Sequence, residues 1–496
     1  AARTMFSRIL PKTRLGRASA GVAAAAFGYT ADKAQCLTVD LDEKTASGLL
    51  KALSKAQAES FKAVYGDLAD GVKELEKWIQ AGCGDTPYYC VEKGAVFGVT
   101  ANGDEYTVEK LPDFSAHNNF MAEFFREHPE VYDKLKDKVT SSGVTLAQCM
   151  KTGVDNPGHP HIKTVGLVAG DEDSYKTFYD LFEPVTSARH GGIAPDFVQP
   201  TDMDLTKLKD TDIDPYNKYV LTSRVRTGRS VRTFKLPPTI SFSERRALEK
   251  LVTGALLNMG GDLKGDYFPL HGSKSYPPKP NGMSEAQEKQ LRATGNLFQE
   301  PDSTLLLASG MGRHWPDARG IFANDNKNLF VWLNEEDHLR IVSMQGDRGK
   351  VTKEGKQIKE VFARFIRACD EVQGVLKANG ADFMHSDHYG WILTCPSNLG
   401  TGLRAGCMVM LPLVSSRPDF KKVLGSMRLQ ARGTGGVDSA SSGGTWDISN
   451  ADRIGKGEVQ LCNILIDGIS TLTRWENMLE NGKASEVEAE IAALKK

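Results

Sequence analysis

The spacing of apolar residues changes once along the chain, near residue 216. From residue 42 to residue 80, apolar side chains recur every three or four positions with lysine and glutamate between them, which predicts an amphipathic helix. A short β-like stretch follows at 88–107. A second helical pattern runs from 113 to about 188 and is broken by turn-forming residues at 155–160. Residues 195–216, rich in aspartate and proline, are predicted to be a linker.

After the linker, short apolar or alternating runs predict strands. These runs are 219–221, 329–333, 339–342, 391–393 and 408–411, and helical patterns lie between them at 243–258 and 358–378. The proline-rich residues 271–281 are predicted to form a surface loop. The pattern therefore predicts a small helical domain followed by a larger domain that mixes helices and strands.

Composition narrows the class of protein. The chain has 496 residues with 62 Lys+Arg against 63 Asp+Glu, a balance that argues against general nucleic-acid binding. No apolar run approaches the roughly 18 residues of a membrane span. The eight cysteines form no CxxC pair, so neither a disulfide framework nor a zinc site is expected. We interpret the cysteines as thiols in a reducing compartment, and we predict no protein-held metal.

The first residues are basic and lack acids. No Asp or Glu precedes Asp32, whereas Arg3, Arg8, Arg14 and Arg17 lie among serine, alanine and short apolar residues. This composition is typical of an organellar transit peptide. We therefore predict a leader over residues 1–40 and a mitochondrial location, in the intermembrane space or at the inner-membrane surface. The alternative is a disordered tail on a cytoplasmic protein.

Two arginines lie two positions apart in a predicted strand. Arg224 and Arg226 alternate with Val225, so on a strand both side chains point to one face. Neighbouring guanidinium groups repel each other unless they share an anion, and their planar forks fit phosphate oxygens. The pair indicates either a phosphate site or a solvated edge strand whose arginines pair with acids of the linker.

Three consecutive acids, Glu335, Glu336 and Asp337, separate two apolar runs, and Arg340 follows them. A solvated turn between two strands is one interpretation. The functional alternative is a carboxylate that accepts a proton or holds a cation, with Arg340 turned toward an anion.

A cysteine opens the turn that follows residues 391–393. Ser397 lies two positions after Cys395, where its hydrogen bond would favour the thiolate. The alternative is a buried, inert cysteine. Gly400 and Gly402 do not form a dinucleotide-binding fingerprint, because the third glycine is misplaced and a strand-like run follows instead of a helix.

Two further arginines complete a set. Arg404 follows the glycine-rich turn, Arg432 begins a second glycine-rich segment, and the chain contains no GxxxxGK[ST] motif. Together with Arg224, Arg226 and Arg340 they suit phosphoryl transfer, in which positioning and charge stabilisation supply most of the catalysis.

Several long motifs resemble those of the phosphagen (guanidino) kinases, and of the creatine kinases in particular. They are Arg224-Val-Arg-Thr-Gly-Arg-Ser, Trp315-Pro-Asp-Ala-Arg-Gly, Asn334-Glu-Glu-Asp-His-Leu-Arg, Cys395-Pro-Ser-Asn-Leu-Gly-Thr-Gly-Leu-Arg-Ala-Gly and Arg432-Gly-Thr-Gly-Gly-Val-Asp. The resemblance implies an α+β fold, with a small all-α N-terminal domain at 111–210. A larger catalytic domain with an antiparallel β-sheet flanked by helices would follow at 215–485. Residues 41–110 would be an extra N-terminal helical segment, and 486–496 a tail.

The family reaction moves the γ-phosphoryl group of MgATP reversibly to a guanidino nitrogen. By resemblance, the nucleotide phosphates would be held by Arg224, Arg226, Arg340, Arg404 and Arg432. Glu336 would orient and deprotonate the guanidinium with support from Glu335. Cys395, as a thiolate whose pKa Ser397 keeps low, would contact the non-reacting nitrogen. Mg²⁺ would be held mainly by ATP phosphates and water. The partners implied are ATP/ADP and a small guanidine, and the assembly implied is a homodimer.

By the same resemblance, the acceptor is predicted to be creatine. Arg189 matches the creatine-type residue where arginine kinases carry tyrosine, and Val437 matches the apolar contact for the creatine N-methyl group. Val154 and Met150 belong to the same guanidine-specificity set, and Met150 stands where creatine kinases usually place isoleucine. Glycocyamine, taurocyamine and arginine are the alternative acceptors.

A few positions depart from the family pattern. Ala323 and Met408 stand where the family has histidines at the nucleotide site, which predicts weaker adenine binding or relaxed base selectivity. Ala381 replaces a tryptophan that joins dimers into octamers, and the C-terminal tail lacks a basic membrane-binding end, so octamers are not expected. The rival functions are a non-catalytic scaffold subunit and a protein-arginine kinase.

Overall fold

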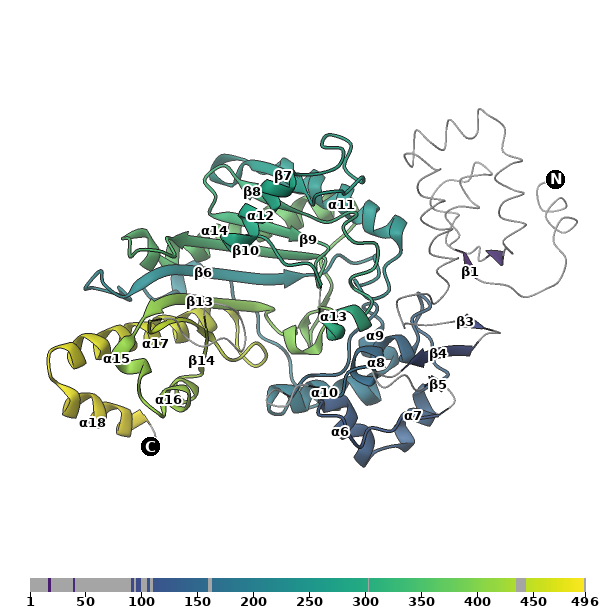
Figure 1. The fold of residues 1–496 in the computed structure, drawn as a ribbon, viewed down its shortest axis with the longest axis horizontal. Helices are drawn as coiled ribbons and strands as arrows, with labels where there is room; N and C mark the ends of the chain where they lie inside the picture. Colours follow the sequence, from purple (N-terminus) through teal and green to yellow (C-terminus); the bar gives the residue numbers. More distant parts are fainter. Residues whose placement is uncertain are drawn as a thin grey trace, which may run out of the picture. The chain divides into compact units, whose positions relative to one another are not determined.

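The computed structural model divides the chain into two compact units, residues 1–113 and residues 114–496 (Figure 1). It describes residues 17–18, 39–40, 91–92, 95–99, 105–107, 110–158, 163–301, 303–433 and 443–494. In the first unit, β1 (Arg17–Ala18) pairs with β2 (Val39–Asp40), and β4 (Ala95–Val99) pairs with β3 (Val91–Glu92) and β5 (Glu105–Thr107). Strands β3 to β5 confirm the β-like stretch at 88–107. The helix expected at 42–80 lies outside the described residues.

The second unit begins with five helices. They are α6 (Phe120–Glu127), α7 (Glu130–Leu135), α8 (Leu146–Val154), α9 (Ser174–Thr177) and α10 (Tyr179–His190). The side chains of Asn119 and Thr145 cap α6 and α8 by accepting backbone N–H groups of the first helical turn. Helix α10 ends at Gly191, whose φ of 83° is a conformation that glycine adopts without strain. The small helical domain is confirmed, and α8 ends just before the predicted break at 155–160.

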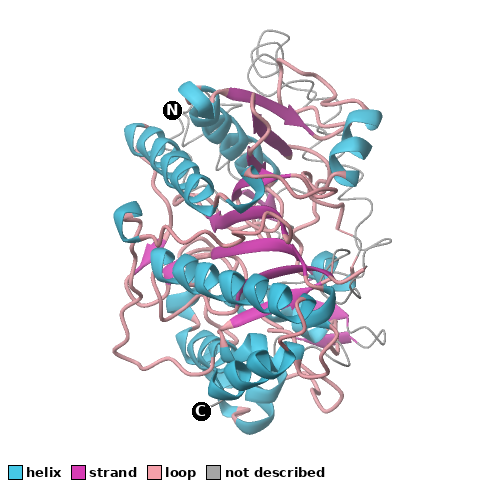
Figure 2. Ribbon diagram, turned by 90° about the vertical axis from the view of Figure 1, so that its left-hand side faces the viewer, coloured by secondary structure: helices cyan, strands magenta, loops and turns pink. Residues whose placement is uncertain are grey.

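An eight-stranded antiparallel sheet forms the centre of the second unit, in the order β14-β15-β13-β6-β10-β9-β8-β7 (Figure 2). Its strands are β6 (Val220–Arg229), β7 (Gly265–Pro269), β8 (Gly320–Asn324), β9 (Leu329–Leu333), β10 (Leu339–Gly346), β13 (Leu403–Met410), β14 (Leu429–Arg432) and β15 (Thr445–Asn450). This arrangement confirms the predicted α+β class. Because β6 lies inside the sheet, the edge-strand interpretation of Arg224 and Arg226 is wrong.

The two faces of the sheet have different coverings. Three long helices, α11 (Phe242–Leu257), α14 (Ile358–Ala378) and α17 (Glu458–Glu480), share the main apolar core with one face. That face contributes Val225, Ile341 and Ala405 to the core. Successive residues of a strand point to opposite faces, so residues 224, 226, 340 and 404 lie on the other face. The helices predicted at 243–258 and 358–378 are confirmed.

Part of this other face is also covered. A second apolar cluster contains Ile321, Phe330 and Val342 from β8, β9 and β10, and it is closed by Met283, Leu297 and Phe298. The strands β6, β13, β15 and β14 contribute no side chain to this cluster among the described residues. The strands that carry Arg224, Arg226, Arg404 and Arg432 are therefore outside this second cluster, whereas Arg340 lies on β10 at its border.

The remaining elements are short or peripheral. They are η2 (Leu205–Lys207), η3 (Gly261–Leu263), α12 (Glu285–Ala293), α13 (Thr304–Ala308), η4 (Glu354–Lys356), β11 (His385–Ser386), β12 (Gly390–Trp391), η5 (Pro396–Asn398), α15 (Pro412–Ser415), α16 (Phe420–Ser426) and α18 (Ala484–Leu494). In the part of the chain that the structure describes, no helix has the length and apolar character needed to cross a membrane.

The strand predicted at 391–393 is mostly wrong, because β12 ends at Trp391. The backbone of the next residues is satisfied in another way: Leu393 accepts a hydrogen bond from the Tyr175 hydroxyl at 2.7 Å, and Thr394 accepts one from Ala169 N at 2.8 Å. The backbone of residues 392–394 is therefore satisfied in part by the helical domain and in part by Met384 O, which accepts from Ile392 N at 3.1 Å.

Candidate active site

The register of the strands brings the predicted arginines to one face of the sheet. Arg226 lies directly opposite Arg404 on β13, and Arg340 lies opposite Gly228 on the other side of β6. Residues that pair directly across two strands point to the same face. Every second residue of a strand also points to one face, so residues 224, 226 and 228 of β6 share it. Arg432 joins the same face through Asp447, which pairs with it across β14 and β15.

Asp447 is the carboxylate between two of these arginines. Its Oδ2 accepts from Arg404 Nη2 at 3.0 Å and from Arg224 Nη2 at 3.3 Å. Burial alone would raise the pKa of Asp447, but the guanidinium groups around it hold the pKa below its ordinary value. Burial and the repulsion of Arg224 and Arg404 lower the pKa of Arg226 well below its usual range. An anion placed here would relieve that repulsion.

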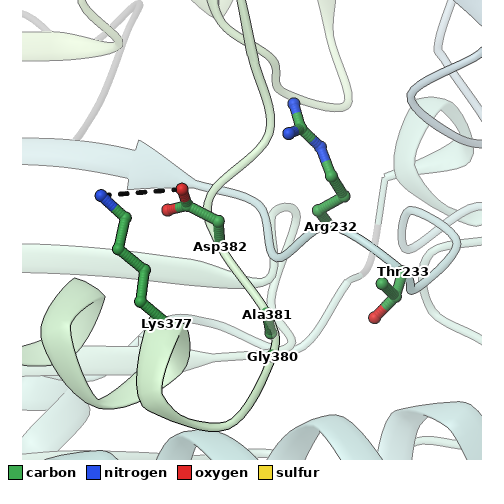
Figure 3. A pocket seen from close by; sticks show the side chains of 6 residues that line it. All are labelled: Arg232, Thr233, Lys377, Gly380, Ala381 and Asp382. Carbon is green, nitrogen blue, oxygen red and sulfur yellow. Dashed lines mark ion pairs between the residues drawn. The ribbon is translucent and has the colours of Figure 1, made fainter.

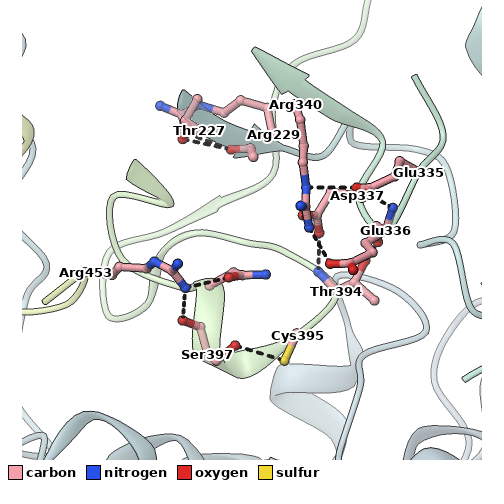
Figure 4. Close-up of polar contacts among 12 residues, drawn as sticks. Thr227, Arg229, Glu335, Glu336, Asp337, Arg340, Thr394, Cys395, Ser397 and Arg453 are labelled. Atoms are coloured by element: carbon pink, nitrogen blue, oxygen red, sulfur yellow. Dashed lines mark hydrogen bonds and ion pairs between the residues drawn. The ribbon is translucent and has the colours of Figure 1, made fainter. Parts of the chain in front are cut away.

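The acidic turn between β9 and β10 folds back onto Arg340 (Figure 4). Arg340 Nη2 donates to Glu336 Oε2 at 2.5 Å, and Arg340 Nε lies 3.0 Å from Glu335 Oε2. Glu335 is 14% exposed and Asp337 2%, whereas Glu336 is 34% exposed. The solvated-turn interpretation is therefore wrong for Glu335 and Asp337. Glu336 has the most accessible of the three carboxylates.

Cys395 lies in the neighbouring turn, and one residue joins the two turns. Thr394 Oγ1 donates to the carbonyl oxygen of Glu336 at 2.8 Å, and Thr394 N donates to Asp337 Oδ1 at 3.2 Å. Cys395 Sγ lies 3.1 Å from Ser397 Oγ, as predicted (Figure 4). Two turns about 60 residues apart in the sequence, one carrying Glu336 and the other Cys395, are thus joined directly.

Two side chains of this centre have shifted pKa values. Burial raises the pKa of Cys395, the Ser397 hydrogen bond opposes that shift, and the charge of Glu336 adds to it. Burial also raises the pKa of Glu335 to about 7, although Arg340 opposes the shift. Both shifts favour neutral side chains. A cation bound beside Cys395 would reverse the charge balance and favour the thiolate.

Arg453 is part of the site, and the sequence analysis did not single it out. Its Nη1 donates to Ser397 O at 2.7 Å and to Asn398 Oδ1 at 2.6 Å, so it holds the turn that carries Cys395 (Figure 4). Asp447, which lies between the arginines, was not singled out by the sequence analysis either. Both residues follow the pattern that revealed the other arginines, a charged side chain in or just after a strand.

The comparisons with known proteins identify the family. Residues 247–479 match the family described as "ATP:guanido phosphotransferase, C-terminal catalytic domain". Residues 115–187 match the family described as the corresponding N-terminal domain. Creatine kinase B-type from Gallus gallus is 50% identical over 382 residues, which are 77% of this chain and 94% of that protein. Creatine kinase M-type from Oryctolagus cuniculus is 49% identical over 377 residues, 76% of this chain and 93% of that protein. The chain belongs to the phosphagen kinases. It is a kinase that transfers a phosphoryl group to a guanidino group.

Solved structures of phosphagen kinases share the fold. A lombricine kinase matches with a TM-score of 0.68 at 38% identity, and the match covers 77% of this chain and 97% of the lombricine kinase chain. The substrate-free duplicated taurocyamine kinase from Schistosoma mansoni matches with a TM-score of 0.63 at 33% identity. That match covers 74% of this chain and 48% of the taurocyamine kinase chain. These relatives differ in the guanidine that they are named for, so the fold alone does not select the acceptor.

The residues expected to select the guanidine are more scattered in this phosphagen kinase than the catalytic ones. Met150 and Val154 lie one turn apart on α8 and are 2% and 1% exposed, so both belong to the core of the helical domain. Arg189 is exposed near the end of α10, where the next residue, His190, contacts Pro396 O at 2.9 Å. Val437 lies outside the described residues.

The two departures from the family pattern occupy different surroundings. Ala323 is 5% exposed and belongs to the second apolar cluster, together with Phe330. Met408 is partly exposed and lies directly opposite Asp447, on the face that carries the arginines. Of the two, Met408 is therefore the residue beside the phosphate-binding groups.

A hollow of about 390 Å³ lies elsewhere on the second unit (Figure 3). It is lined by Arg232, Thr233, Lys377, Gly380, Ala381 and Asp382. The charges along it are paired: Arg232 Nη2 lies 2.7 Å from Glu172 Oε1, and Lys377 Nζ lies 3.7 Å from Asp382 Oδ2. None of the predicted site residues lines it. Among the described residues, no group of three or more His, Cys, Asp or Glu side chains could hold a metal ion.

Proposed function

We propose that the acceptor of this phosphagen kinase is creatine, and that the chain interconverts MgATP and creatine with MgADP and phosphocreatine. The observation that carries the reaction is the link through Thr394, which joins the turn that carries Glu336 to the turn that carries Cys395. Arg340 contacts the Glu336 carboxylate, so this pair of turns lies at the face of arginines. Identity of about 50% to two creatine kinases, over more than nine-tenths of their length, supports creatine. Arg189, expected at the guanidine site, supports it as well.

The arginine face binds the nucleotide phosphates in this proposal. Arg226 and Arg404 lie opposite each other, and Asp447 accepts hydrogen bonds from Arg404 and Arg224. Triphosphate oxygens would complete this charge balance, and bidentate guanidinium contacts would fix the γ-phosphorus in line with the acceptor. The same contacts would stabilise the charge that spreads over the equatorial oxygens in the transition state.

Glu336 is the base. It is the most exposed of the three acids, and its contact with Arg340 holds the carboxylate beside the phosphate face. As the guanidino nitrogen forms its bond to the γ-phosphorus, the bond from that phosphorus to the bridging oxygen of ADP breaks. The proton on the attacking nitrogen passes to the Glu336 carboxylate. In the reverse direction Glu336 returns the proton.

Cys395 contacts the acceptor on its non-reacting side. In the free protein, burial raises the pKa of this thiol. A guanidinium cation beside the sulfur lowers that pKa, and the Ser397 hydrogen bond acts in the same direction. Substrate binding and thiolate formation are thus coupled, so the cation and the sulfur anion stabilise each other.

Magnesium enters with the nucleotide. The acids of the site are already engaged, since Glu335, Glu336 and Asp337 all contact Arg340. Such a set does not form a cage for a small hard cation, which prefers phosphate oxygens and water when these are present. We therefore write the substrate as MgATP.

The test is turnover on a panel of guanidines. Creatine, glycocyamine, taurocyamine, lombricine and arginine are each supplied with MgATP, and ADP release is followed, with Glu336→Gln as the inactive control. The proposal predicts the highest kcat/KM with creatine. A higher value with another guanidine refutes creatine, and no ADP release with any compound refutes the catalytic proposal.

We also propose that residues 1–40 direct the chain to the mitochondrion. The support is the run of basic residues without acids before Asp32. A fusion of residues 1–40 to a fluorescent protein should enter mitochondria. The same fusion with Arg3, Arg8, Arg14 and Arg17 changed to glutamine should remain in the cytoplasm. Cytoplasmic fluorescence from the unaltered fusion would refute the proposal.

A further inference from the structure

Three arginines gather where the first turns of α11 meet the segment that leads into β8. Arg245 and Arg319 are 0% exposed, and Arg313 is partly buried. Their hydrogen bonds go to backbone carbonyl groups: Arg313 donates to Ile240 O at 2.8 Å, and Arg319 donates to Arg313 O at 2.9 Å. Arg245 has one long contact, to Pro237 O at 3.4 Å. No carboxylate lies within ion-pair distance of the three in the described part of the chain.

Several donors of this cluster have no acceptor. Among the residues that the structure describes, no hydrogen-bond partner is found for three buried atoms: Nε and Nη1 of Arg245 and Nε of Arg319. His314 is beside them, since all three guanidinium groups act on its ring, and its Nδ1 also lacks a partner. Burial and these arginines lower the pKa of His314 to about 3, so its ring is neutral and adds no charge at neutral pH.

The nearby carboxylates are already occupied. Asp317 accepts from Arg246 Nε at 2.7 Å and from Arg246 Nη2 at 3.1 Å. Glu244 accepts from the backbone N–H of Ser241 at 2.8 Å, in the capping box that begins α11. Both act on the cluster only from a distance. In the part of the chain that the structure describes, three guanidinium groups therefore share a largely buried volume with no carboxylate in contact. Such an arrangement is strongly destabilising unless a counter-charge is present.

We propose that this cluster is a binding site for one small inorganic anion of about the size of chloride, held by Arg245 and Arg319 beside His314. The unpartnered N–H groups would donate to the anion, as guanidinium groups do to oxyanions and halides. Arg245 and Arg319 are completely buried, so we expect a small anion to be preferred to a large one. The site is separate from the phosphate-binding face, since none of its arginines lies on a strand of that face.

The position of the site suggests what the anion stabilises. Asn334 Nδ2 donates to Ala318 O at 2.7 Å and to Arg245 O at 3.3 Å, so one amide joins α11 to the residue before Arg319. Asn334 also directly precedes Glu335. The anion would hold together the two segments on which the acidic turn rests.

The experiment measures thermal unfolding without nucleotide as chloride replaces gluconate at constant ionic strength. His314→Asp places a carboxylate among the three arginines, and His314→Asn is its neutral match; both residues tolerate the positive φ of 61° at this position. Arg404→Lys alters the phosphate-binding face instead. We expect the midpoint of the wild type to rise by about 2 °C for each tenfold increase in chloride above saturation. His314→Asn and Arg404→Lys should keep this rise, and His314→Asp should lose it.

Three results would overturn the proposal: no chloride dependence in the wild type, an unchanged rise in His314→Asp, or loss of the rise in Arg404→Lys alone. The last result would place the anion on the phosphate-binding face. Should His314→Asp fail to fold, crystals of the wild type grown in bromide decide the question. An anomalous peak within hydrogen-bond reach of Arg245 Nε or Nη1 supports the site, and density for water alone refutes it.

Discussion

Replacing Glu336 by glutamine separates the chemical role of this residue from its structural one. Glu336 is 34% exposed, and its partner Arg340 keeps two other carboxylates, Glu335 at 3.0 Å and Asp337 at 3.3 Å. A partly exposed pair contributes little to stability. We therefore expect Glu336→Gln to lower the free energy of unfolding by less than about 1 kcal/mol.

The effect on turnover should be much larger. The glutamine amide cannot accept the proton of the guanidino nitrogen, and it removes the negative charge that orients the acceptor cation. Loss of a positioned general base costs about 10²- to 10⁴-fold in rate, equivalent to about 3–5 kcal/mol of activation free energy. The binding of MgADP should persist, because the glutamine leaves the arginine side chains in place.

The assay combines ADP release, calorimetry with MgADP and urea unfolding on the same preparation. Glu335→Gln is the matched control: its carboxylate accepts from Glu336 N at 2.8 Å and faces Arg340, so it positions the turn. Loss of the Glu335 carboxylate should reduce turnover less than loss of the Glu336 carboxylate does. Turnover of Glu336→Gln within threefold of the wild type would refute the assignment of the base. A loss of more than about 3 kcal/mol in stability would show that the ion pair is structural.

Three further substitutions test neighbouring contacts. Cys395→Ser should lower kcat by about 10²-fold or more with unchanged MgADP binding, whereas equal kcat would exclude a thiolate role. Arg453→Lys loses one of its two contacts, to Ser397 O or Asn398 Oδ1. It should reduce kcat about tenfold and change the rate at which iodoacetamide alkylates Cys395; unchanged alkylation would contradict this support. Burial raises the pKa of Glu335 from 4.5 to about 7, so the folded state binds more protons than the unfolded one between these values, and stability falls as pH rises through that window. Glu335→Gln should remove up to about 3 kcal/mol of this decline in the free energy of unfolding, which urea unfolding from pH 4 to pH 8 measures. An unchanged dependence of stability on pH in this variant would contradict the raised pKa of Glu335.

The sequence by itself determined the main helices, several strands of the sheet and the chemical groups of the site, whereas β7, β8, β14 and β15 were not predicted. Alternation in β6 and the 3.6-residue period in α11 and α14 are local signals, because burial of one face requires them wherever the element lies. The residue types at Arg224, Glu336 and Cys395 likewise indicated phosphoryl transfer before any geometry was known.

Only the tertiary structure decided which of these groups meet. The central position of β6 follows from pairing with β10 and β13, partners more than 100 residues away in the sequence, and this position excluded an edge strand. The run at 391–393 leaves its strand after Trp391, and the carbonyl oxygen of Leu393 accepts from Tyr175 of the helical domain. The unpartnered donors of Arg245 depend on which carboxylates lie within reach. Local patterns carry no information about such long-range contacts, because the same alternation or arginine is compatible with many partners.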